Sequence, residues 1–114
     1  MAIIIQTQNP LQLNERIRQL VVEYPLLTWE VDTDNDYTLI LERWRYRAWM
    51  RPNTDRQADG ELQFGIVSST RYPMTTTLYA VYHARFAEFL LSHFDREIQS
   101  LSITPNLSEG VDIY

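Results

Sequence analysis

The stretch from Tyr37 to Arg51 constrains the fold more than any other part of the chain. Between residues 43 and 50, basic residues at odd positions alternate with apolar residues at even positions. The alternating residues are Arg43, Trp44, Arg45, Tyr46, Arg47, Ala48 and Met50. Successive side chains of a β-strand point to opposite faces of the sheet, so this pattern predicts a half-buried strand with one apolar and one basic face.

The first half of the stretch has the opposite parity. Leu39 and Leu41 are apolar at odd positions, and an unbroken strand would place them on the basic face. One extra residue near Glu42 and Arg43 would restore a common apolar face, so we predict a β-bulge there. The alternative is a first half that is buried on both faces.

A basic strip on this strand is the candidate binding site, and it consists of Arg43, Arg45, Arg47, Trp49 and Arg51. Trp49 departs from the alternation and falls among the arginines. It is interpreted either as an edge aromatic that lies on arginine stems or as an interface anchor, since Trp and Arg are enriched in binding hot spots. A solvated outer sheet face, partly offset by Glu30 and Glu61 on neighbouring strands, is the alternative to a binding role.

Charge is unevenly distributed along the 114 residues. The net charge is −5, but residues 43–51 contain four arginines and no acid, which leaves −9 for the remainder. This acidic background disfavours general binding to nucleic acid or to an anionic membrane. The basic strip instead favours an acidic protein partner or a second copy of the chain.

The composition excludes several chemistries. Cysteine and lysine are both absent, so disulfides, thiolate ligands, Schiff-base lysines and the P-loop lysine are excluded. No apolar run is long enough to span a membrane, and the first residues lack the basic region of a signal peptide. We therefore expect a cytoplasmic protein that does not bind membranes.

Periodicity predicts the elements around the central strand. Residues 3–5 predict a strand, and Asn9, Pro10 and Gln12 predict the start of a helix that ends before Pro25. Further strands are expected at 28–32 and 61–68, with a turn at 32–36 and a loop at 51–60. A second helix is expected to begin at residues 75–77 and to end between His93 and Gln99.

The expected fold is therefore a single α+β domain spanning residues 1–114. An antiparallel sheet carries two helices on one face, in the order β-α-β-β-β-α, and a tail follows. For the tail, either Leu101 and Ile103 add a strand or residues 103–114 form a flexible segment.

No pattern indicates a catalytic, metal or cofactor site. His83 and His93 lie about 280° apart on a helix, so they do not share a face. Asp32, Asp34 and Asp36 have the spacing that opens a calcium loop, but Tyr37 and Arg43 occupy the positions where such a loop needs Gly and Glu. A plain hairpin turn is the better interpretation.

The expected function is a non-enzymatic protein-interaction module that forms a homodimer and uses the basic strip. The alternative is a nucleic-acid-binding protein that uses the same residues. In a strand, however, Trp44 and Tyr46 point away from the arginines, so bases and phosphates would need opposite faces. A third possibility, small-molecule binding between sheet and helices, needs a polar-lined cavity.

Overall fold

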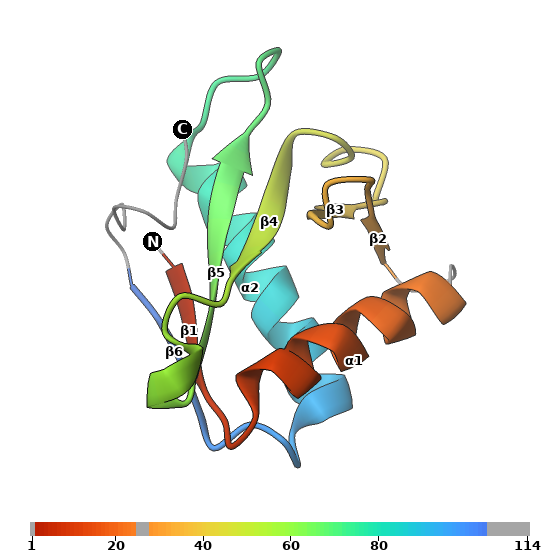
Figure 1. Cartoon of the computed structure of the whole chain (residues 1–114). Coiled ribbons are helices and arrows are strands. Elements are labelled where there is room, and N and C mark those ends of the chain that lie inside the picture. Colours follow the sequence, from red (N-terminus) through yellow and green to blue (C-terminus); the bar gives the residue numbers. More distant parts are fainter. Residues whose placement is uncertain (1, 25–27, 105–114) are drawn as a thin grey trace.

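The computed structural model describes residues 2–24 and 28–104 and shows an α+β fold (Figure 1). In these residues six antiparallel strands form one open sheet in the order β2-β3-β4-β5-β1-β6, accompanied by two α-helices. The elements are β1 (Ala2–Gln6), α1 (Pro10–Glu23), β2 (Trp29–Val31), β3 (Tyr37–Leu39), β4 (Ala48–Asn53), the short 3-10 helix η1 (Gln57–Asp59), β5 (Glu61–Ser68), α2 (Thr76–Phe94) and β6 (Ser100–Ile103). The predicted fold class is confirmed.

Both helices share one core with one face of the sheet. Alternate side chains of the strands enter this core, as Leu62, Phe64 and Ile66 of β5 do. The apolar stripes of the helices face them, with Ile17 at the centre of α1 and Phe86 at the centre of α2. The sheet therefore has a covered face and an outer face.

Four aromatic rings from four elements meet at the centre of the core. The Phe86 ring of α2 lies 4.9 Å from the ring of Trp29 on β2 and 4.8 Å from that of Phe64 on β5. Tyr37 of β3 completes the group, 5.6 Å from Phe86. Burial raises the pKa of the Tyr37 hydroxyl above its ordinary value. These rings fill the space between sheet and helices where the third functional possibility would need a cavity.

The helix starts follow the predicted capping chemistry. The Asn9 side chain accepts a hydrogen bond from the Gln12 amide at 3.1 Å, and Pro10 occupies the first turn of α1. Thr75 caps α2 by accepting from the Leu78 amide at 3.1 Å. Helix α2 ends at Phe94, within the predicted interval.

The prediction of one strand from residue 37 to 51 is wrong. β3 ends at Leu39, residues 40–47 form turns, and β4 begins at Ala48. β3 and β4 are antiparallel neighbours, because Tyr37 pairs with Met50. The change of parity at residues 42–43 therefore marks a reversal of the chain and not a β-bulge.

Two other boundaries also differ from prediction. β4 continues to Asn53 and a turn of 3-10 helix occupies Gln57–Asp59, so the predicted loop at 51–60 is shorter than expected. The strand alternative for the tail is confirmed by β6, which pairs with β1. The tail beyond residue 104 lies outside the described residues.

Replacement of Phe86 by alanine tests the central role of its ring. We expect Phe86→Ala to lower the free energy of unfolding by about 3–5 kcal/mol, the usual cost of truncating a buried Phe. Urea denaturation measures the difference. The control is Leu91→Ala on the same helix, because Leu91 is 49% exposed and its truncation should cost less than about 0.5 kcal/mol. Equal losses in the two variants would contradict the packing described here.

Candidate functional site

The structure separates the five predicted binding residues into two groups. Arg43, Arg45 and Arg47 lie in the loop between β3 and β4, so the prediction that they line an open sheet face is wrong. Trp49 and Arg51 lie on β4 and alternate with buried core residues, so their side chains point to the outer face as predicted. These three arginines therefore belong to an arginine-rich loop, residues 40–47, and not to a basic strand face.

Local hydrogen bonds form this loop. The amides of Trp44 and Arg45 both donate to the carbonyl of Leu41, at 2.9 and 2.8 Å, and the Arg47 amide donates to the carbonyl of Trp44 at 3.3 Å. Tyr46 has φ of 57°, in the left-handed region that bulky residues seldom adopt. Backbone strain of this kind persists only where the surrounding structure holds it in place.

Each arginine of the loop lies over an aromatic ring. The guanidinium carbon of Arg43 is 5.1 Å from the centre of the Trp44 ring, and that of Arg45 is 4.8 Å from the Tyr46 ring. Both distances are typical of cation–π contacts. Arg45 also lies 3.7 Å from the carboxylate of Glu30.

The third contact joins two segments that are distant in sequence. Arg47 lies 4.2 Å from the centre of the Tyr72 ring, in the connection between β5 and α2. Ala48 pairs with Ser68, so the chain leaves β5 beside the point where it enters β4, and both connections lie at the same end of the sheet (Figure 1). We call this surface the basic aromatic end and define it as Arg43, Trp44, Arg45, Tyr46, Arg47, Arg71 and Tyr72.

A buried tyrosine of α2 anchors the loop from the side of the core. The Tyr82 hydroxyl donates to the carbonyl of Trp44 at 2.5 Å and lies 3.1 Å from the Thr38 hydroxyl. Thr38 in turn donates to the carbonyl of Ala48 at 2.9 Å. Burial raises the pKa of the Tyr82 hydroxyl above its ordinary value. The loop is therefore fixed at both of its ends and in its middle.

Arg51 is engaged within the chain. Its Nε and Nη2 atoms lie 3.0 and 2.8 Å from the two carboxylate oxygens of Asp36, a bidentate geometry. The hydrogen bond to Asp36 raises the pKa of Arg51. This pair ties the turn between β2 and β3 to β4, which gives Arg51 a structural role.

The turn at residues 32–36 is a hairpin turn, as predicted. The Asp32 carboxylate accepts from the amides of Asp34 and Asp36 at 2.9 and 3.0 Å, and Asn35 has φ of 63°. The carboxylates of Asp32, Asp34 and Asp36 come within 4.8 Å of one another, and in the described part of the chain they are the only group of three possible metal-ligating side chains. Two of these carboxylates already have partners, because Asp32 accepts the turn amides and Asp36 pairs with Arg51.

A depression of about 380 Å³ lies on the outer face beside the basic aromatic end. Trp49 and Val67 are paired across β4 and β5, and both line it. The acidic turn borders it from the β3 side, while residues that follow β5, including Arg71, border it from the other side. We call it the outer-face cleft, and its lining residues are Asp32, Asp34, Asp36, Tyr46, Trp49, Arg51, Val67, Ser68, Ser69, Thr70 and Arg71.

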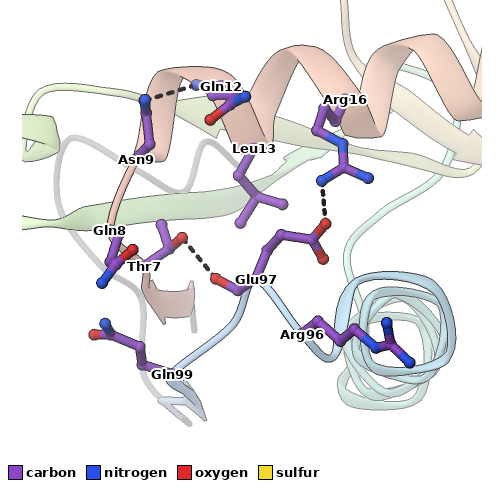
Figure 2. A pocket seen from close by; sticks show the side chains of 9 residues that line it. All are labelled: Thr7, Gln8, Asn9, Gln12, Leu13, Arg16, Arg96, Glu97 and Gln99. Carbon is purple, nitrogen blue, oxygen red and sulfur yellow. Dashed lines mark hydrogen bonds and ion pairs between the residues drawn. The ribbon is translucent and has the colours of Figure 1, made fainter.

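A polar pocket of about 330 Å³ lies at the opposite end of the sheet, where β1 meets α1 (Figure 2). Four of its lining side chains, those of Thr7, Asn9, Arg16 and Glu97, bond to other groups that line it. Thr7 donates to the carbonyl of Glu97 at 2.7 Å, the Glu97 carboxylate pairs with Arg16, and Asn9 caps the helix. The bonds across the pocket hold α1 to the connection from α2 to β6. The side chains that line the pocket form no nucleophile–base pair.

The two histidines lie apart, as predicted. His83 is buried, with its ring stacked on Tyr79 at 4.1 Å and its Nδ1 atom 2.8 Å from the Tyr79 carbonyl. His93 is exposed near the end of α2.

Arg71 and Tyr72 are the site residues that sequence reasoning missed. They belong to the connection before α2, and only the β4–β5 register brings them to the loop at 40–47. A basic residue next to an aromatic, immediately before Pro73, is the one local signal that could have indicated them.

Comparisons with protein-family models, with curated proteins and with solved structures found no match for this chain. In the described residues, neither helix combines the length and the apolar character needed to cross a membrane.

Removal of the Tyr82 hydroxyl tests the anchoring of the loop. We expect Tyr82→Phe to lower the free energy of unfolding by about 1–2 kcal/mol, because the carbonyl of Trp44 loses its buried donor. Chemical denaturation at neutral pH measures this. Tyr72→Phe is the control, since Tyr72 is 37% exposed and its hydroxyl anchors no backbone group in the described residues. An unchanged stability in Tyr82→Phe would rule out the anchor.

The buried tyrosines also predict a loss of stability at alkaline pH. Tyrosines of the unfolded chain ionise near pH 10, whereas burial holds the pKa of Tyr37 and Tyr82 higher in the folded chain. Above about pH 10 the unfolded state therefore binds fewer protons, and the free energy of unfolding falls as pH rises. Denaturation at a series of pH values should show a shallower fall for Tyr37→Phe than for the wild type. An exposed-site control, Tyr24→Phe, should keep the wild-type slope.

Proposed function

We propose that this chain is a non-enzymatic protein-interaction module that binds an acidic segment of a partner protein at its basic aromatic end. The observation that carries the proposal is the Arg47–Tyr72 contact at 4.2 Å, which joins two loops into one surface. Tyr46 and Tyr72 are 46% and 37% exposed on that surface. Trp, Tyr and Arg are the residues in which binding energy is usually concentrated.

The local charge supports an acidic partner. The loops at 40–47 and 69–75 contain four arginines and a single acid, Glu42, on a chain whose net charge is −5. A basic patch against an acidic background orients an incoming acidic segment and repels it elsewhere. The cytoplasm remains the compartment that we propose for this module, on the composition of the chain alone.

The rigidity of the surface also supports binding. Tyr82 fixes the carbonyl of Trp44, Arg47 is fixed by Tyr72, and Arg45 is oriented by the Tyr46 hydroxyl at 3.0 Å. Side chains that are already ordered lose less conformational entropy when a partner binds. A preorganised group of arginines and tyrosines therefore suits recognition better than a mobile loop would.

Single-stranded nucleic acid is the second candidate, and one observation favours it. Trp44 and Tyr46 share a loop with the arginines, so they do not lie on the opposite face of a strand, and the geometric objection drawn from the sequence no longer applies. Base stacking, however, needs free aromatic faces. Guanidinium groups already lie over the rings of Trp44, Tyr46 and Tyr72, and the net charge of −5 opposes a polyanion. We therefore rank an acidic protein segment first.

Binding of a labelled Glu-rich peptide, followed by fluorescence anisotropy, tests the proposal. We expect wild-type binding that weakens as salt is added, because exposed charges are screened. Arg47→Glu should weaken it by about tenfold or more, the usual effect of losing an interface arginine. Arg56→Glu is the matched control: it makes the same charge change at the other end of β4, where Arg56 follows Asn53.

The competing outcomes are distinct. Equal weakening in Arg47→Glu and Arg56→Glu would mean that only net charge matters, which would contradict a localised site. A labelled single-stranded oligonucleotide, titrated in parallel, tests the second candidate. Binding of the oligonucleotide but not of the peptide, lost in Arg47→Glu, would replace the proposal with nucleic-acid recognition.

A further inference from the structure

The outer-face cleft has charges of opposite sign on its two sides, and from this we infer that its occupant is a second copy of the chain. Two copies pair about a two-fold axis, so that Arg71 of each lies against Asp34 of the other. The inference rests on the proposed function, because the basic aromatic end supplies the basic half of the contact. It adds the identity of one partner and the part of that partner that is bound.

The order of the strands fixes the arrangement of charge. β4 carries Trp49 in the middle of the cleft, β3 and the acidic turn lie on one side of it, and β5 followed by Arg71 lies on the other. A two-fold interface uses the same patch twice, so every contact between residues i and j recurs as j with i. A patch with an acidic side, an apolar middle and a basic side is therefore complementary to itself when rotated by half a turn.

The charges on the two sides are available for such a contact. In the part of the chain that the structure describes, neither Asp34 nor Arg71 forms an ion pair, and both are exposed. Asp36 differs, because Arg51 already neutralises it at 2.8 Å. Asp34 and Arg71 are thus the pair that a partner copy would satisfy.

The middle of the cleft supplies the apolar part of the interface. Trp49 and Val67 are only partly buried, and they form the second residue pair of the β4–β5 ladder, next to Ala48 and Ser68. Tyr46, held in a left-handed conformation, adds an exposed ring at the rim. Partly exposed aromatic residues surrounded by charged ones are typical of the centre and rim of a protein–protein interface.

A charge exchange tests this pairing. Light scattering across a concentration series should show a wild-type dimer whose dissociation constant rises with salt. Asp34→Arg and Arg71→Glu should each shift the chain to monomer, because like charges then face each other twice in one dimer. The double variant, and an equimolar mixture of the two single variants, should both form dimers, since each restores both reciprocal pairs.

Matched controls separate local pairing from a general charge effect. Asp59→Arg and Arg56→Glu make the same changes in the β4–β5 connection, far from the cleft, and should leave the dimer intact. Circular dichroism of every variant confirms that it is folded. Trp49→Ala, which changes no charge, should raise the dissociation constant by about tenfold or more if Trp49 is the apolar anchor.

Several outcomes would overturn the inference. A wild-type chain that is monomeric at every concentration would do so, as would dimers of Asp34→Arg or Arg71→Glu as stable as the wild type. Failure of both the double variant and the mixture to dimerise would exclude the reciprocal geometry. If the Glu-rich peptide still binds a monomeric wild type through Arg47, only the dimer is overturned, whereas absence of both activities would overturn the proposed function as well.

Discussion

The attachment of the β2–β3 hairpin to the rest of the sheet depends on side-chain packing more than on backbone pairing. β3 is paired with β4 at a single position, Tyr37 with Met50, whereas β4 and β5 are paired along the whole of β4. Side-chain contacts compensate, among them the hydrogen bond from the Thr38 hydroxyl to the carbonyl of Ala48. The rings of Trp29 and Tyr37 pack on Phe86, and the carboxylate of Asp36 binds Arg51 in a bidentate geometry. The basic aromatic end and the outer-face cleft depend on these contacts, because the arginine-rich loop and the acidic turn lie at the two ends of β3.

The shortness of β3 holds opposite charges close together. The three residues Tyr37–Leu39 separate the acidic turn from the arginine-rich loop, a distance of about 10 Å at 3.3 Å per residue. That is more than the Debye length of about 8 Å at physiological salt, so the attraction between the two exposed groups is largely screened. The strand between them keeps the two groups apart, and the acid that Arg45 approaches, at 3.7 Å, is Glu30 of β2 and not a residue of the acidic turn. A surface with unneutralised charge of both signs follows directly from this geometry.

Elements with strong local signals could be predicted from the sequence. The caps at Asn9 and Thr75, the apolar stripes of both helices and the alternation in β5 are local features, and all of them are present. The turn at 32–36 was equally predictable from its Asp and Asn residues. The two-layer α+β class follows from these elements alone, because each has one apolar face that must be covered.

The reversal at 40–47 could not be predicted from alternation, because the alternation there has another cause. Arg43 and Arg45 each lie over the ring of the residue that follows, so arginine and aromatic residues alternate through neighbouring cation–π contacts and not through a pleat. Glycine and proline, which usually mark a turn, are absent from this loop, and Tyr46 adopts the left-handed conformation instead. The contact of Arg47 with Tyr72 depends on strand register, which no local pattern reveals.

The same contacts determine what the basic aromatic end can recognise. The guanidinium groups of Arg43, Arg45 and Arg47 each lie over one ring, and Arg45 also donates to the Tyr46 hydroxyl. The planar guanidinium matches the two-oxygen geometry of a carboxylate, whereas a stacked base would compete with a guanidinium for the rings of Trp44, Tyr46 and Tyr72. Recognition of Asp and Glu side chains is therefore the chemistry that we propose for this surface. The acidic turn of an identical chain offers one such carboxylate, that of the exposed Asp34, beside the outer-face cleft.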